Sequence, residues 1–369
     1  MYYNPAQTLG SIEWFLRSLT KREEERARQL HSRATVLDAH SDIGVDILRR
    51  RMKGESDILR RMHRREFKAG GITCALFAVW ADSESYSFGG YGQATSMALR
   101  SVAFAKEEIE ACRAWAVQAR SVEDIRRAKK QAKVAFVFHF EGAMPLDEDI
   151  RYVSVFKELG VVSVGPVWNV RNQVADGIEQ RSGSGLSNFG AMLVSELDRS
   201  RIAIDMSHLS EKGFWDVMAL AKGQVIATHS NARTLCGNPR NLKDDQIQAI
   251  AEKGGVIGVC FYSPFVDAKK PSLDRLLDHI DHIVGLVGVN HVGLGPDFTD
   301  YMAEESVKIP SPGLVTGKAA LHLYPRGIQN ASKMLNITRG LVSRGYSDEE
   351  ILKILGENFL RTLRQVWGS

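Results

Sequence analysis

Eight short apolar runs that alternate with helical patterns constrain the fold of this chain more than any other feature. Each run has five to eight residues, is rich in Val and Ile, and lacks the polar alternation of a strand with one wet face. Such runs are typical of parallel strands that are buried on both faces. The runs occupy residues 36–42, 72–79, 133–140, 161–168, 202–207, 225–229, 255–262 and 291–297.

Helical patterns separate most of these runs and determine the predicted architecture. They cover Val102–Ala116, Phe189–Arg199, Lys212–Ala221, Asp244–Lys253 and Leu273–Val287. Eight strands with intervening helices predict a (β/α)8 barrel, with a doubly wound open sheet as the alternative. A length of 369 residues is compatible with one such barrel. We expect an N-terminal helical extension over residues 1–35 and a barrel domain over residues 36–369.

The C-terminal third carries two further local signals. The segment 299–325 contains prolines and glycines and is predicted to be a long loop after the eighth strand. Ser347 and Glu350 have the spacing of a helix N-cap and its capping-box partner. We expect the helix that follows, through Leu355 to Trp367, to close the bottom or the side of the barrel.

Polar side chains end the predicted strands. His40 and Asp42 end the first run, and residues two apart in a strand point to the same side. Further groups of this kind follow the third, fifth, sixth and eighth runs, namely Glu141, His208, His229 and Asp297. The C-terminal ends of barrel strands share one face, where active sites form. We therefore expect these six side chains to converge.

Three imidazoles and three carboxylates at one mouth indicate a metal centre. Mixed His and carboxylate ligands suit zinc or a similar divalent ion. Six such groups exceed what one tetrahedral ion takes, so we predict two ions bridged by a carboxylate, which could hold a bridging hydroxide and polarise a carbonyl. We interpret His139, in the middle of a strand, as a core residue. Five further histidines are interpreted as surface or helix residues, namely His31, His63, His279, His282 and His322.

Composition excludes several classes of partner. The formal net charge of +4 is spread thinly, without a basic stripe that has interleaved aromatics, so we do not expect nucleic-acid binding. No apolar run approaches the roughly 20 residues of a membrane span, and residues 1–10 lack a secretory pattern. Four cysteines are widely spaced and are predicted to be buried free thiols, namely Cys74, Cys112, Cys236 and Cys260. These signals together predict a cytoplasmic protein without a membrane partner.

Several motifs in a fixed order resemble one known family. They are Asp38-Ala39-His40-Ser41-Asp42, Glu141-Gly142-Ala143, Asp205-Met206-Ser207-His208, Thr228-His229-Ser230-Asn231-Ala232-Arg233, Asn238-Pro239-Arg240-Asn241, His291-Val292-Gly293-Leu294-Gly295-Pro296-Asp297-Phe298 and Gly356-Glu357-Asn358-Phe359-Leu360-Arg361. Over residues 36–365 the chain resembles the membrane (renal) dipeptidases, a family of zinc dipeptidases within the amidohydrolase superfamily.

The resemblance implies two Zn²⁺ ions, or other divalent ions, and a role for each candidate residue. It implies that one zinc is held by His40 and Asp42, that Glu141 bridges both ions, and that the second zinc is held by His208 and His229. It also implies that Arg240 binds the terminal carboxylate of the substrate, for which a guanidinium is well suited. Asp297 would move the proton between the bridging water and the leaving amine.

One position departs from the family pattern. Trp168 stands where these dipeptidases have a histidine that contacts the substrate near the second metal. Indole has a single N–H donor and cannot accept a proton. Asn169, Arg171 and His139 are the candidates that could supply the missing contact.

The substrate therefore stays open at this point. We expect a dipeptide-like substrate with a free carboxylate, including one with a D-configured C-terminal residue. An N-acyl amino acid, a lactone or another small amide or ester is the alternative that Trp168 suggests. A catalytically silent metal-binding barrel would be marked by a broken ligand set, whereas all five ligand candidates are present here. We also expect a homo-oligomer, in the first instance a dimer.

Overall fold

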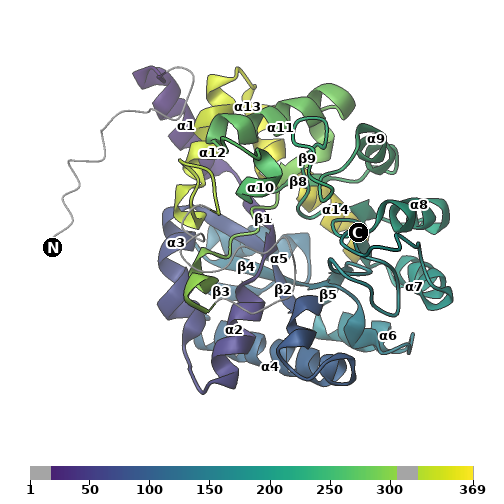
Figure 1. Cartoon of the computed structure of the whole chain (residues 1–369). Coiled ribbons are helices and arrows are strands. Elements are labelled where there is room, and N and C mark those ends of the chain that lie inside the picture. The colour runs from purple at the N-terminus through teal and green to yellow at the C-terminus, as the bar shows by residue number, and fades with distance from the viewer. Residues whose placement is uncertain (1–17, 306–322, 369) are drawn as a thin grey trace.

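Parallel strands occupy the centre of the molecule and helices surround them (Figure 1). The computed structural model describes residues 18–305 and 323–368. Its strands are β1 (Val36–Ser41), β2 (Ile72–Ala81), β3 (Ala116–Gln118), β4 (Val134–Glu141), β5 (Val161–Val164), β6 (Ala203–Asp205), β7 (Val225–Ile226), β8 (Ile257–Val259) and β9 (Val292–Leu294). Each of the eight predicted runs overlaps one of them, β2 and β4 extend beyond their runs, and β3 is additional.

The strand order is that of a barrel in which two pairs of neighbouring strands are joined by a single bridge each. One sheet runs β1-β2-β4-β5-β6-β7, with β3 paired to β4 beside this path, and β8 pairs with β9. A single parallel bridge between Ala227 and Ile257 joins β7 to β8, and another between Ser41 and Phe298 joins the end of β9 to β1. The predicted (β/α)8 barrel class is thus confirmed. The short strand β3 was missed because it begins where a helical pattern was expected to end.

Helices follow most of the strands, and four of the five predicted helical patterns end within one residue of the observed helix, whereas the pattern 102–116 ends five residues beyond α4. They are α1 (Lys21–Arg33), α2 (Ile43–Met52), α3 (Arg64–Ala69), α4 (Ala94–Ala111), α5 (Val122–Lys130), α6 (Tyr152–Leu159), α7 (Asn188–Arg199), α8 (Glu211–Leu220), α9 (Asp244–Glu252), α10 (Ser263–Val266), α11 (Leu273–Val287), α12 (Leu335–Ser343), α13 (Asp348–Leu352) and α14 (Asn358–Trp367). The predicted capping box of Ser347 and Glu350 is formed at the start of α13. Within the described ranges, no helix has the length and apolar character that crossing a bilayer requires.

Alternating side chains separate the core into two layers. In β4, Phe136 faces the surrounding helices, whereas Val137 belongs to a second apolar cluster inside the barrel. Phe359 and Leu363 of α14 join this inner cluster, so α14 closes the bottom of the barrel, as the sequence suggested. Phe359 packs under Gly293 of β9, where a Cβ atom would lie 2.4 Å from its ring. The four predicted free cysteines are buried and unpaired, namely Cys74, Cys112, Cys236 and Cys260.

The N-terminal helix α1 packs on α12 outside the barrel. His31 links the two helices, since its Nδ1 lies 2.8 Å from Thr338 Oγ1 and its Nε2 lies 2.8 Å from the carbonyl oxygen of Gly70. The division at residue 35 stays a prediction, and residues 1–17 lie outside the described part. The predicted loop 299–325 opens with a 3₁₀ helix, Asp300–Glu305, whereas residues 306–322, including His322, are outside the described residues.

Candidate metal centre

The inward side chains of β4 lead from the apolar core to the mouth of the barrel. Val137 lies in the inner cluster, His139 follows two residues later, and Glu141 ends the strand. His139 is fully buried, and its ring centroid lies 4.9 Å from that of His40. Its interpretation as a core histidine therefore fits its position one layer below Glu141.

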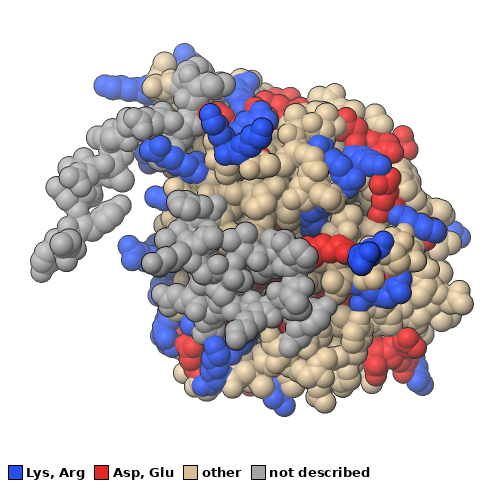
Figure 2. Space-filling model, viewed as in Figure 1, with Lys and Arg blue, Asp and Glu red and all other residues tan. Residues whose placement is uncertain are grey.

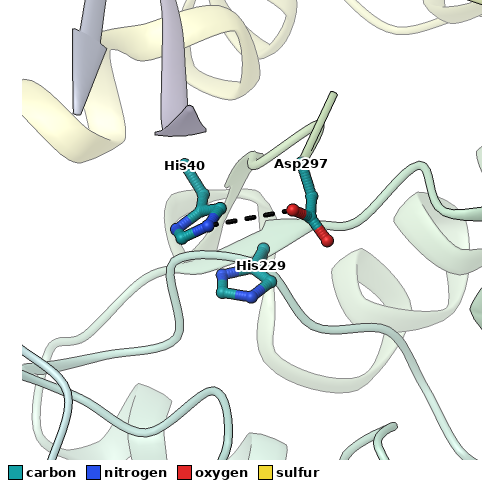
Figure 3. A group of neighbouring side chains, drawn as sticks. All are labelled: His40, His229 and Asp297. Carbon is teal, nitrogen blue, oxygen red and sulfur yellow. Dashed lines mark ion pairs between the residues drawn. The ribbon is translucent and has the colours of Figure 1, made fainter. Parts of the chain in front are cut away.

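His40 and Asp42 converge on Glu141 from the end of β1. The Nε2 atom of His40 lies 3.4 Å from Glu141 Oε1 and 3.6 Å from Asp42 Oδ1. It also lies 3.8 Å from Oδ1 of Asp297, which follows β9 (Figure 3). One imidazole thus faces three carboxylates that come from three different strand ends.

His208 and His229 approach Glu141 from β6 and β7. His208 Nε2 lies 2.8 Å from Glu141 Oε1, and His229 Nε2 lies 3.4 Å from the same oxygen. The two Nε2 atoms are 3.0 Å apart. His229 also stacks on His40, with ring centroids 3.8 Å apart, so the two sides of the site are in contact (Figure 3).

The ligand atoms form overlapping groups that could each hold a metal ion. Within each group the atoms lie within 4.8 Å of one another, and the groups are His40, Asp42 and Glu141; Glu141, His208 and His229; and His40, His229 and Asp297. Neither ring nitrogen of His40 has a hydrogen-bond partner among the described residues, although the ring is fully buried. A buried nitrogen without a partner is costly unless it binds something. The donor types and this orphaned ring fit a divalent metal ion.

Hydrogen bonds fix the orientation of the histidines on the β6 and β7 side. His208 donates from Nδ1 to Asn169 Oδ1 over 2.7 Å. His229 Nδ1 lies 2.8 Å from Thr228 Oγ1, whose hydroxyl donates to Asp205 Oδ2 over 2.5 Å. Because the Thr228 hydroxyl is used as a donor, His229 Nδ1 must carry the proton. Both Nε2 atoms are thereby left with a lone pair directed at the centre.

Burial and charge act differently on the titratable groups of the site. Burial lowers the pKa of His208 and of His229 well below the usual value, and the positive charges of Arg240 and His40 lower both further. Burial also opposes the charged form of His40, but Glu141, Asp42 and Asp297 together outweigh it and raise its pKa to about 10. Burial raises the pKa of Asp297 to about 6 and that of Glu141 well above its usual value.

Asp297 adopts a backbone conformation that is unusual for an aspartate. Its φ of 58° lies in the left-handed region, which costs free energy unless the surroundings hold it. Tyr324 donates its hydroxyl to the carbonyl oxygen of Asp297 over 2.5 Å and accepts from Thr299 N over 2.6 Å. Cys260 Sγ lies 3.7 Å from Asp297 Oδ2, as a thiol donor to the carboxylate. These contacts direct the side chain of Asp297 toward His40.

Arg240 is a buried cation beside this cluster. It donates from Nη1 to Ser230 Oγ over 3.1 Å and from Nη2 to the carbonyl oxygen of His229 over 3.2 Å. Its Nε atom is buried and has no partner among the described residues. A buried guanidinium with an unused N–H group is suited to a carboxylate ligand.

The three candidates for the contact missing at Trp168 have different surroundings. Trp168 is 5 % exposed and its ring centroid lies 6.1 Å from that of His208. Asn169 contacts His208 directly, as described above. Arg171 instead pairs with Asp176 at 2.5 Å on the outer part of the same loop, and His139 lies below His40. Asn169 is thus the candidate that the structure brings into contact with His208.

Three residues that touch this machinery were not singled out from the sequence. Asp82 directly follows β2, so the strand-end rule that found Glu141 would also have found it. Asp205 belongs to the motif that contains His208, but nothing in the motif assigns it to Thr228 of the next strand. Tyr324 gives no sequence signal, because its contact with Asp297 crosses the whole loop. Outside the centre, the predicted helix histidines His31, His63, His279 and His282 do lie on helices, the first three buried.

The face in Figure 2 carries acidic and basic side chains side by side. Elsewhere in the described residues, many charged side chains are paired, for example Lys243 with Glu211 at 2.6 Å. Within the described residues of this face, neither sign forms a continuous stripe.

Comparison with known proteins gives one family. The family model of membrane dipeptidase (peptidase family M19) matches residues 24–308 and 317–367. An uncharacterized protein from the pqqA 5′ region of Klebsiella pneumoniae is 35 % identical over 259 residues, which covers 67 % of this chain and 88 % of that protein. The chain spans little more than half the length of other curated relatives, 54–56 %.

Solved structures give the same fold. An amidohydrolase from Pseudomonas aeruginosa superposes with a TM-score of 0.77 at 27 % identity, covering 93 % of this chain and 99 % of that one. A metallo peptidase from Rhodobacter sphaeroides, liganded with a phosphinate mimic of the dipeptide L-Ala-D-Ala, also gives 0.77, at 24 % identity. That match covers 90 % of this chain and 99 % of the neighbour, and at this identity it speaks for the fold alone.

Proposed function

The chain belongs to the membrane dipeptidase family of metallopeptidases, peptidase family M19, and we propose that it is a zinc dipeptidase that hydrolyses dipeptides with a free C-terminal carboxylate. The observation that carries this proposal is the position of Glu141. Its carboxylate belongs both to the group with His40 and Asp42 and to the group with His208 and His229. One carboxylate shared by two ligand groups is what a two-ion site requires.

The residues divide between the two ions as follows. His40 and Asp42 would hold one zinc, His208 and His229 the other, and Glu141 would bridge them. When bound, the ions would supply Lewis acidity toward the amide carbonyl and a lowered pKa for water in the site. Zinc is favoured by the imidazole and carboxylate donors.

The protein residues would bind the substrate and move its protons. Arg240 would pair its unused Nε–H with the terminal carboxylate of the dipeptide, which fixes the scissile amide relative to the centre. Asp297 would accept a proton from the attacking water and return it to the amine nitrogen as the amide bond breaks. Its raised pKa, about 6, suits a group that must both accept and release a proton near neutral pH.

Metal analysis and a substrate panel test the proposal together. The protein is stripped with a chelator, reloaded with Zn²⁺, counted for bound metal, and assayed on L,L and L,D dipeptides. L,D substrates are included because a neighbour of the same fold binds a mimic of L-Ala-D-Ala. We expect two ions per chain and hydrolysis of dipeptides, with a large loss of kcat/KM when the C-terminal carboxylate is amidated. The amidated dipeptide is the control for Arg240.

Two other results would replace the proposal. Trp168 fills the position of the family histidine and is almost fully buried, which favours a related amidohydrolase as the second candidate. Faster turnover of N-acyl amino acids, lactones or other small esters than of any dipeptide would establish it. Well under one ion per chain, with no turnover, would instead indicate a catalytically silent barrel.

A further inference from the structure

Asp82 is a buried carboxylate that the proposed mechanism does not use. It follows β2 at the mouth of the barrel and is 1 % exposed. It accepts hydrogen bonds from Trp80 Nε1 over 2.9 Å, from the backbone N–H of Met144 over 3.0 Å and from Asn172 Nδ2 over 2.8 Å. None of these donors is a cation, so the carboxylate is held by neutral groups from three separate strand ends. A buried carboxylate of this kind is costly and needs all of its partners.

On one side, Asp82 packs against the turn that carries Glu141. Gly142 has a φ of +115°, and a Cβ atom there would lie 2.1 Å from Asp82 Cγ. Only glycine fits this backbone conformation and this close approach. The carboxylate of Asp82 and the backbone that follows Glu141 are therefore in direct contact.

On the other side, Asp82 holds the loop after β5 through Asn172. The Nδ2 group of Asn172 donates to Asp82 and, over 2.8 Å, to the carbonyl oxygen of Pro166. Its Oδ1 accepts from the backbone N–H of Val174 over 2.8 Å and of Ala175 over 3.1 Å. One amide side chain thus gathers both ends of the segment 166–175 at Asp82.

Trp168 and Asn169 lie within this segment. Asn169 accepts from His208 over 2.7 Å, so any shift of the segment also shifts a partner of the centre. Gly177 packs on the same backbone, since a Cβ there would lie 2.0 Å from the carbonyl oxygen of Trp168. The segment thus contacts His208 through Asn169, Gly177 through the backbone of Trp168, and Asp82 through Asn172.

We propose that Asp82 is a positioning residue that clamps the segment 166–175 to the Glu141–Gly142 turn, so that Trp168 and Asn169 keep their places beside His208. The consequence for substrate selection rests on the proposed function, whereas the clamp itself does not. Asp82 would thereby govern which substrates fit and how well His208 is prepared to bind metal. It would not take part in the chemical step.

A merely structural role for Asp82 makes a different prediction. Asp176 offers a matched control, because it is equally buried at 1 % exposure and lies in the same loop. Its partners are Arg171, which lies within the segment 166–175, and Ser182 and the backbone N–H of Ser184, which follow that segment. Loss of Asp176 should speed exchange from Arg171 onward but leave residues 166–169 protected, because Asn172 still links the carbonyl of Pro166 to Asp82.

The test uses three variants, namely Asp82→Asn, Asn172→Ala and the double variant that combines both. Asp176→Asn is the control for all three. Hydrogen–deuterium exchange is measured over residues 166–175, Zn²⁺ binding is titrated calorimetrically on the chelated protein, and kcat and KM are measured on the dipeptide panel. We expect faster exchange in 166–175 for both single variants and little further change in the double variant, because both break the same link. The Zn²⁺ site of His208 and His229 should lose affinity by about tenfold, while the site of His40 and Asp42 keeps its affinity.

The kinetic constants distinguish loss of the clamp from a general loss of stability. KM should rise and the order of preference within the panel should change, while kcat on the best substrate stays within about threefold. Unchanged exchange in 166–175 would overturn the proposal, as would equal effects on both Zn²⁺ sites or the same pattern in Asp176→Asn. If Asp82→Asn does not fold, Asn172→Ala decides alone. If the wild type hydrolyses no dipeptide, the proposed function fails, and exchange and Zn²⁺ titration still decide on the clamp.

Discussion

The two halves of the metal centre share Glu141 but are built in opposite ways. On the first half, His40 faces the carboxylates of Asp42, Glu141 and Asp297, and no hydrogen bond within the described chain holds its ring. On the second half, the close carboxylate partner of His208 and of His229 is Glu141, and Asp297 lies within 4.8 Å of His229. The neutral side-chain oxygen of Asn169 hydrogen-bonds Nδ1 of His208, and that of Thr228 hydrogen-bonds Nδ1 of His229.

This difference indicates two ways of preparing a cation site. The first half concentrates negative charge, so a cation entering it relieves repulsion between carboxylates. The second half carries little charge of its own and instead fixes the tautomer and the direction of each imidazole. We therefore expect the first half to depend on its charges and the second half on its hydrogen bonds.

The largest effect is expected where the halves join. Glu141→Gln keeps the shape of the side chain but removes the shared negative charge, so both ions should be lost together with all measurable turnover. Metal content of the reloaded protein and activity on the best dipeptide measure this, with a thermal melt as the control for folding. A variant that still holds two ions would show that the halves do not depend on Glu141.

A smaller but still severe loss is expected at Asp297. Asp297→Asn retains a residue that tolerates the left-handed conformation but cannot shuttle a proton. Turnover should fall by about 10²- to 10⁴-fold while bound metal is retained. Steady-state kinetics and metal analysis on the same sample measure both. Near-normal turnover would remove Asp297 from the proton path.

The hydrogen bonds of the second half can be tested at Thr228. Thr228→Val removes the hydrogen bonds that link Asp205 to His229 without changing the net charge. The affinity of the His208–His229 site for Zn²⁺ should fall by about 10- to 100-fold, while that of the His40–Asp42 site should stay unchanged. Calorimetric Zn²⁺ titration of the chelated protein resolves the two sites. Thr338→Val is the matched control, because Thr338 bonds His31 over 2.8 Å in an equally buried place far from the barrel mouth. An equal loss of Zn²⁺ affinity at both sites would contradict the expected dependence of the second half on its hydrogen bonds.

On the first half, the backbone of Asp297 can be tested through Tyr324, and the expected effect is smaller. Tyr324→Phe removes the hydroxyl that holds the carbonyl of Asp297, so we expect kcat to fall by about tenfold, close to 1.4 kcal/mol, with both ions kept. Tyr301→Phe is the control, since the Tyr301 hydroxyl is buried and has no hydrogen-bond partner among the described residues. If both variants behave alike, the tyrosine hydroxyl does not position Asp297.

The last comparison of the two halves concerns pH and the stability of the metal-free protein, and not turnover. The pKa of His40 is raised to about 10, so its protonated form stabilises the fold fully below the ordinary pKa of 6.5, and this stability is lost as the pH rises through about 10. The free energy of unfolding should decline by at most about 1.4 kcal/mol per pH unit in that window. Urea unfolding of the chelated protein at several pH values measures it. His40→Asn should lack this slope, whereas His229→Asn should keep it.

Much of this picture could be predicted from sequence because it depends on local pattern. The apolar runs predicted eight of the nine strands, and polar residues at five of the strand ends predicted the six converging side chains. The link between Asp205 and Thr228 joins neighbouring strands, and the contact of Tyr324 with Asp297 depends on a tertiary fold-back. Neither leaves a periodic signal. Strand β3 was missed because three residues are too few to show a period.

The helix that closes the bottom of the barrel has a consequence for how the chain folds. Phe359 and Leu363 complete an inner cluster that also contains Leu37 and Cys74, residues that lie near the other end of the described chain. Contacts between such distant segments slow folding, because a long loop must close before they form. While the chain is being synthesised, the inner face of β1 and β2 would remain without its cover until α14 has emerged. We expect refolding of the barrel to be limited by the docking of α14.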